Sequence, residues 1–247
     1  MERSFSRLDA DLDSLSGLEL QAPAHVRREF NRKVALSWVY HELHVEGTPI
    51  SGPDVLRAAS GDLGRNYCDG LVLQRARTFL AAYDRMRDAS LAREPLSLSM
   101  ALEYHALLLG GPERAVFRTE SGATEQYKHD VIAPERIESA LEELFREVRH
   151  MALRAHPIAL AALVHHRFTR IWPFDRHSAA VARLLANQVL LSHGYPAIII
   201  PAYDRQRYYH VMNYELARTL ELFTSGVNEQ IQLRRRELQP RPESVAA

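Results

Sequence analysis

The sequence lacks the features of a secreted, membrane-spanning or polyanion-binding protein. Cys68 is its one cysteine, so no internal disulfide can form, and the charged start does not resemble a signal peptide. Lysine plus arginine and aspartate plus glutamate each number 31, which leaves no net charge to attract nucleic acid. Apolar runs are broken by Arg or His before the roughly 18 residues that a membrane span needs. These absences predict a cytoplasmic protein with neither nucleic acid nor a membrane as partner.

Strand signals are scarce as well, and helical periodicity dominates the chain. Apolar residues recur three or four positions apart, and a hydrophobic content of 46% can fill one core. We therefore expect a single mainly α-helical domain over residues 24–223. Residues 1–23 show no sustained periodicity and are predicted to be a loosely ordered lead-in. Residues 224–247, with the run Arg234-Arg235-Arg236, are predicted to be a solvated C-terminal tail.

One segment departs from the helical pattern. Residues 115–132 contain alternating and turn-forming stretches, which predict a small exposed β-hairpin. Its Arg118, Tyr127 and Lys128 are candidates to hold an extended segment of a protein client by β-strand addition. An exposed hairpin edge without a partner is the plainer alternative.

Several motifs, in the correct order, resemble the Fic (Fido) family. The stretch from Trp172 to Arg183 reads WPFDRHSAAVAR, where the family pattern is HPFx(D/E)GNGRxxR, and LLANQVLLSHGYPAIII after it resembles the motif helix and its exit. Phe117-Arg118-Thr119 resembles the family's flap, and residues 42–47 (ELHVEG) resemble its inhibitory (S/T)xxxE(G/N) helix. The resemblance implies a Fic-fold helical bundle with a β-hairpin flap at 115–132, an inhibitory-type helix at 24–47 and core motif helices at 157–194.

The resemblance also implies a chemistry that this motif has lost. In the family the motif histidine is the general base for AMP transfer, but Trp172 stands there, and indole has no basic nitrogen. Arg176 replaces the acid that holds Mg²⁺, and a cation cannot ligate a metal ion. His177, Ser178 and Ala179 replace the Gly-Asn-Gly that wraps phosphates, and the first motif arginine is replaced by alanine. Ordinary AMP transfer is therefore not expected.

Two functional readings remain open. The first is a pseudoenzyme that binds a protein partner, or a nucleotide or phosphorylated small molecule without the usual Mg²⁺, through Trp172, Arg176, Ser178 and Arg183 at a helix N-terminus. The second is a repurposed enzyme that performs a transfer or elimination on a phosphorylated or nucleotide-linked substrate, with His177 as the acid or base and Arg176 and Arg183 as phosphate ligands. Trp172 as a core filler and Arg176 with His177 as solvated loop residues are the plainer alternatives. The histidines show no zinc spacing, so no metal site is predicted.

Glu46 and Arg183 match the glutamate and arginine that pair in inhibited family members. We therefore expect them within ion-pairing distance. With the catalytic residues replaced, a structural ion pair is favoured over a regulatory one, because a partly buried arginine without its carboxylate would be costly.

Overall fold

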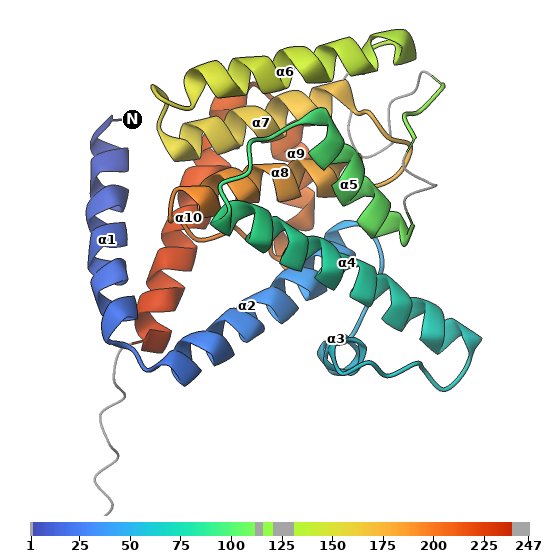
Figure 1. Ribbon diagram of the computed structural model, residues 1–247, viewed down its shortest axis with the longest axis horizontal. Coiled ribbons are helices and arrows are strands. Elements are labelled where there is room, and N and C mark those ends of the chain that lie inside the picture. The colour runs from blue at the N-terminus through green and yellow to red at the C-terminus, as the bar shows by residue number, and fades with distance from the viewer. Residues whose placement is uncertain (1, 112–115, 121–130, 239–247) are drawn as a thin grey trace, which may run out of the picture.

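The computed structural model describes residues 2–111, 116–120 and 131–238, and these form ten α-helices with no β-strand among them (Figure 1). This confirms the mainly α-helical fold. None of the described helices is long and apolar enough to cross a membrane. In chain order the elements are α1 (Glu2–Gln21), α2 (Ala24–Val45), α3 (Gly52–Ala59), α4 (Tyr67–Leu91), α5 (Leu98–Leu109), η2 (Pro134–Arg136), α6 (Ile137–Met151), α7 (Pro157–Ile171), α8 (Ser178–Ser192), η3 (Ala202–Asp204), α9 (Arg205–Met212) and α10 (Leu216–Leu238).

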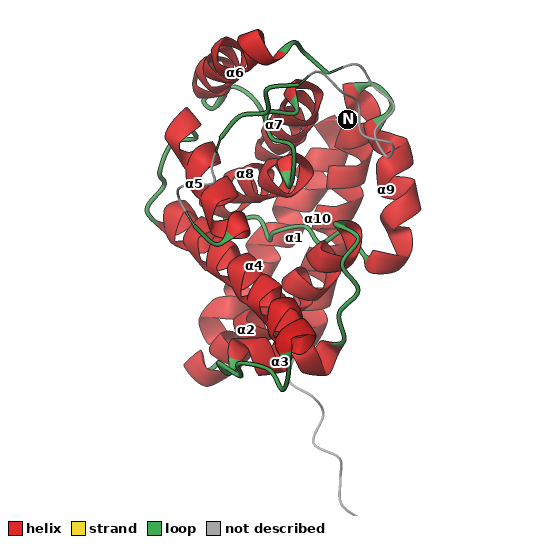
Figure 2. Cartoon of the chain, turned by 90° about the vertical axis from the view of Figure 1, so that its right-hand side faces the viewer, coloured by secondary structure: helices red, strands yellow, loops and turns green. Residues whose placement is uncertain are grey.

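Helix α8 lies at the centre of the bundle. Every residue from Ser178 to Leu190 is buried, because α7, α4 and α5 all pack against this helix. Figures 1 and 2 both place α8 inside the molecule, with α7 on one side and α4 on the other. The segment between α7 and α8, which carries the motif, is therefore held at both ends by buried helices.

Short polar signals set the helix boundaries around this core. The side chains of Ser51, Asn66 and Ser97 accept hydrogen bonds from free backbone N–H groups in the first turns of α3, α4 and α5. Helix α5 ends at Gly110, whose φ of 82° is inexpensive for a residue without a side chain. Helix α6 buries one apolar stripe, as its sequence pattern predicts: Ile137, Leu141, Leu144, Phe145 and Val148.

The prediction of a loosely ordered lead-in over residues 1–23 is wrong. Residues 2–21 form α1, which packs against α10 at the far end of the chain. Leu8 and Leu15 are 4% and 2% exposed, and Asp11 pairs with Arg235 at 2.8 Å. A spacing of seven puts both leucines on one helix face, a signal too sparse to stand out in the sequence.

The predicted tail is also wrong for residues 224–238, because α10 continues to Leu238. Gly226 lies inside this helix, where α10 packs closely against Ile198. A Cβ there would lie only 3.1 Å from the Ile198 Cγ2. The glycine therefore permits close packing of the helix, and Arg234 and Arg235 form contacts with α1 and α2.

The predicted β-hairpin at 115–132 has no counterpart among its described residues. Residues 116–120 and 131–132 form no strand, and the rest of the segment lies outside the described part of the chain. Arg118 takes a different role from the one expected, as shown below.

Candidate functional site

The loop between α7 and α8 is a tight bend with two left-handed residues. Trp172 ends α7 with a φ of 49°, and His177 precedes α8 with a φ of 63°. Buried Ser178 closes the bend: its hydroxyl accepts from the Phe174 N–H and donates to the Phe174 carbonyl, both at 2.8 Å. The hydroxyl of Ser178, a predicted ligand-binding residue, is therefore engaged within the loop.

Arg183 lies one turn into α8 and is 1% exposed. Its Nε is 2.8 Å and 2.9 Å from the two carboxylate oxygens of Glu42, and its terminal nitrogens bond Glu46 at 2.7 Å and the Tyr208 hydroxyl at 2.9 Å. The expected ion pair between Glu46 and Arg183 is confirmed. A carboxylate on α2 (Glu42), a second at the C-cap of α2 (Glu46) and a phenol on α9 thus hold one guanidinium.

Glu46 also joins His177 to this network, because the second Glu46 oxygen lies 2.9 Å from the His177 Nδ1. Burial raises the pKa of Glu46, but the His177 hydrogen bond and the Arg183 charge outweigh it and bring the pKa to about 2. Burial raises the pKa of Glu42, and Arg183 opposes that rise. Glu46 is therefore the firmly ionised partner, and it occupies the N-terminal end of α8, where an anion is favoured.

The network continues through Tyr208 to His165. The Tyr208 oxygen accepts from Arg183, so its O–H donates to the His165 Nε2 at 3.0 Å. Burial, with the Arg183 charge, holds the pKa of His165 well below its ordinary value, so the ring is a neutral acceptor. The chain of hydrogen bonds therefore runs from the exposed loop at His177 into the core.

Trp172 and Arg118 form the other side of the bend. Trp172 is 7% exposed, and its carbonyl accepts from the buried Arg118 Nε at 2.7 Å. The terminal nitrogens of Arg118 donate to the carbonyls of Glu120 and Ile132, and its backbone N–H donates to the Pro173 carbonyl. Arg118 is thus committed to the carboxyl end of α7. Tyr127 and Lys128 lie outside the described residues.

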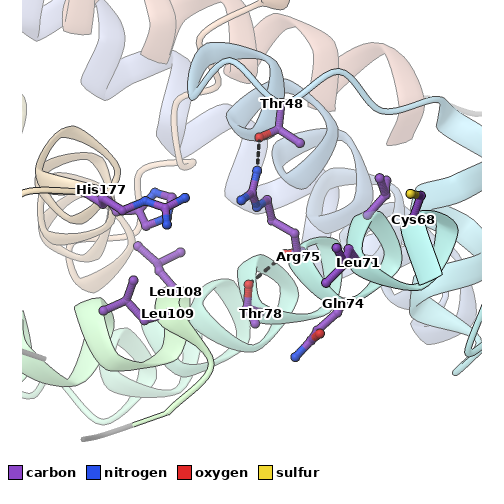
Figure 3. A pocket seen from close by; sticks show the side chains of 11 residues that line it. Thr48, Cys68, Leu71, Gln74, Arg75, Thr78, Leu108, Leu109 and His177 are labelled. Atoms are coloured by element: carbon purple, nitrogen blue, oxygen red, sulfur yellow. Dashed lines mark hydrogen bonds between the residues drawn. The ribbon is translucent and has the colours of Figure 1, made fainter. Parts of the chain in front are cut away.

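Two adjoining cavities open beside the loop. The first has a volume of about 200 Å³ and includes Glu46, Arg75, Trp172, Asp175 and Arg176 in its lining. The second, of about 420 Å³, extends between α4 and α5 and shares Thr48, Arg75, Arg176 and His177 with the first (Figure 3). The structure thus brings Arg176, His177, Ser178 and Trp172 to one cavity, while Arg183 lies behind Glu46.

These residues do not fit a Mg²⁺ ion. The carboxylates in the lining of the smaller cavity are Glu46, whose oxygens bond Arg183 and His177, and the exposed Asp175. Arg75 and Arg176 line the same cavity, and two cations there oppose a divalent metal ion. Among the described residues, no group of three or more His, Cys, Asp or Glu side chains is arranged to hold a metal ion.

Sequence reasoning missed three participants: Glu42, Arg75 and Tyr208. Glu42 carried a readable signal, because it precedes Glu46 by four residues and so shares its helix face. Arg75 and Tyr208 are far from the motif in sequence, and only the packing of α4 and α9 brings them to it.

Comparisons with known proteins agree with this arrangement. The family model "Fic/DOC family" matches residues 95–190. The chain is 28% identical over 219 residues to the protein adenylyltransferase Fic of Drosophila grimshawi, an alignment that covers 85% of the chain but 44% of that relative. It thus spans less than half the length of the relative.

Solved structures share the fold across nearly the whole chain. A Fic domain-containing signalling protein from Bacteroides thetaiotaomicron superposes with a TM-score of 0.84 at 20% identity, covering 96% of this chain and 98% of that one. Fic-1 from C. elegans superposes with a TM-score of 0.75 at 21% identity, covering 96% and 71%. Together, these comparisons show that the chain has the Fic fold, and that its residues 95–190, which include the bend between α7 and α8, match the Fic/DOC family model.

Proposed function

We propose that this chain is a Fic-fold pseudoenzyme that does not transfer AMP and binds an anionic ligand beside its motif loop. The observation that carries the proposal is the position of Glu46, whose carboxylate is held by Arg183 and His177 at the N-terminal end of α8. A nucleotide phosphate would compete for that place with a carboxylate already paired to the buried arginine.

The loss of chemical groups supports the same conclusion. Trp172 offers no basic nitrogen where the family resemblance places the general base, and losing such a base costs about a hundredfold to ten-thousandfold in rate. Arg176 and Arg75 line the smaller cavity with positive charge, whereas a Mg²⁺ ion needs anionic oxygen ligands. Arg75 and Arg176, which form no ion pair with a described residue, are then the groups available to an anion in place of Arg183.

The test is incubation of the purified protein with ATP and Mg²⁺ and a candidate protein substrate, followed by intact-mass spectrometry. We expect no adduct with the mass of one AMP, and none for Trp172→His, because the base alone restores neither the metal site nor the phosphate cradle. An active Fic adenylyltransferase provides the positive control. An AMP adduct that depends on Arg176 or His177 of this chain would overturn the proposal.

A second candidate is an enzyme that uses the cleft for another transfer or elimination. It is favoured by the 2.9 Å contact between Glu46 and His177, since a carboxylate bonded to Nδ1 orients an imidazole for acid–base work at its other nitrogen. Turnover of phosphorylated or nucleotide-linked compounds, detected by mass spectrometry and abolished in His177→Ala, would establish it. Ligand binding without turnover would favour the pseudoenzyme.

A further inference from the structure

The larger cavity extends from the motif loop towards α4 and α5 and has two chemically different sides. Figure 3 shows Arg75 and Thr78 on α4, Leu108 and Leu109 at the end of α5, and His177 facing them across the cavity. Its volume of about 420 Å³ lies within the range of small-molecule sites. This space is bounded by α4 and α5, so a ligand here would extend away from Glu46 and Arg183.

One side of the cavity carries the guanidinium groups of Arg75 and Arg176, with the ring of His177, which bonds Glu46, beside them. No Asp or Glu is among the described residues that line this cavity. Arg75 is half-buried and donates to the Thr48 hydroxyl at 2.7 Å, and neither Arg75 nor Arg176 takes part in an ion pair between described residues. A guanidinium that is partly removed from water and has no carboxylate favours an anion, and its planar donors suit a phosphate or carboxylate group.

The other side is apolar. Leu71, Val72, Leu108 and Leu109 contribute hydrocarbon surface, and Leu71 is 46% exposed although it lines the cavity. Covering this surface with an apolar group would remove it from water, which is favourable by about 25 cal/mol for each Å² buried. A ligand that satisfies both sides needs a charged head and an apolar body.

We propose that this cavity between α4 and α5 binds a small amphiphilic anion, a phosphate monoester that carries an aromatic or other apolar group. The phosphate lies against Arg75 and Arg176, and the apolar group lies over Leu71 and Leu109. This inference rests on the proposed function, because Arg176 and His177 belong to both the motif-loop site and this cavity. It adds the chemical class of the ligand and the apolar side of the cavity that would contact it.

Cys68 provides a direct readout of occupancy. It lines the cavity, is exposed and free, and is the one cysteine of the sequence, so a thiol reagent labels a single known position. We expect naphthyl phosphate to slow labelling of Cys68 in a saturable way. Inorganic phosphate, which lacks the apolar body, and naphthol, which lacks the charge, should each require at least tenfold higher concentration.

Variants separate this site from general effects on the protein. Arg75→Met should weaken protection by naphthyl phosphate at least tenfold, and Leu71→Ser, at an exposed position where folding is not at risk, should weaken it severalfold. Arg87→Met, also on α4 but outside the cavity lining, is the matched control and should leave protection unchanged. Absence of protection, or unchanged protection in Arg75→Met, would overturn the inference.

The labelling experiment contains no ATP, so its result is independent of the AMP-transfer assay. Protection of Cys68 together with AMP transfer would leave this site standing and remove the proposed function. If Cys68 is not protected and no AMP is transferred, this cavity site is ruled out and the proposed function stands.

Discussion

His177 shows how a single residue preserves the shape of a motif while changing its chemistry. Its φ of 63° is the left-handed conformation in which glycine is favoured, and the family resemblance places a glycine there. The histidine costs backbone strain of about 1 kcal/mol, offset in part by its hydrogen bond to Glu46. The bend therefore keeps the backbone conformation of a glycine, while the His177 side chain forms a hydrogen bond with the Glu46 carboxylate.

Substitutions at this position separate the two effects. His177→Gly and His177→Ala both lose the Glu46 contact, but only glycine relieves the strain. We expect His177→Gly to be more stable than His177→Ala by about 1 kcal/mol, measured by urea unfolding. Equal stability of the two variants would mean that the left-handed conformation is not retained in solution.

The depressed pKa of Glu46 makes a pH-dependent contribution to stability. Its folded value of about 2 lies below the ordinary 4.5, so the stabilisation is complete above pH 4.5 and is lost as pH falls towards 2. We expect the difference in unfolding free energy between the wild type and Glu46→Gln to shrink by about 3 kcal/mol over that window. Chemical denaturation at several pH values checks this, and a pH-independent difference would contradict it.

At the scale of elements, Arg118 ties residues 116–120 to the end of α7. The carboxyl end of a helix carries partial negative charge, and the guanidinium supplies donors to several carbonyls at once. This is a cation at a helix C-terminus in a buried setting, where its contribution is larger than on a surface. Residues 116–120 and Ile132 are thereby held against the motif loop.

Replacing Arg118 tests this attachment. We expect Arg118→Met to lower the unfolding free energy by about 3 kcal/mol, because several carbonyls lose a charged donor. Arg118→Lys should restore little of this loss, since an ammonium group lacks the planar spread of donors. Limited proteolysis should cut within residues 116–120 or 131–133 faster in both variants than in the wild type. A stable, protease-resistant Arg118→Lys would show that charge alone suffices.

The elements that sequence predicts well are those with dense local patterns. The stripe of α6 and the motif helices α7 and α8 were readable because their apolar periodicity is strong, and the bend resembled a known motif. Helix α1 was not predicted because the leucines that it buries, Leu8 and Leu15, are covered by α10, which is distant in sequence. The end of α10 was predicted as a tail because the contacts of Arg234 and Arg235 are made with α1 and α2, at the other end of the chain. The Glu46–Arg183 pair was predictable from the resemblance, whereas the contribution of Arg75 depends on tertiary packing.

At the scale of the whole molecule, Arg183 connects three helices. It lies on α8, its two carboxylate partners lie on α2 and at the C-cap of α2, and its phenol partner lies on α9. We expect Arg183→Met, which keeps most of the side-chain volume, to lower the unfolding free energy by about 3 kcal/mol by leaving Glu42 and Glu46 buried without a cation. The double variant Arg183→Met with Glu42→Gln should recover part of this loss in urea unfolding. No recovery would show that packing rather than charge accounts for the effect.

The separation of these partners along the chain also bears on the order of events in folding. Glu42 and Arg183 are 141 residues apart, so their contact closes a long loop and is expected to form after the barrier, when the helices are already docked. Loss of Arg183 should then leave the folding rate nearly unchanged and speed unfolding by about a hundredfold. Stopped-flow chevron plots would reveal this as a shift of the unfolding arm alone. The glutamate-bound arginine would thus provide kinetic stability: it sets the lifetime of the folded state and not the rate at which that state forms.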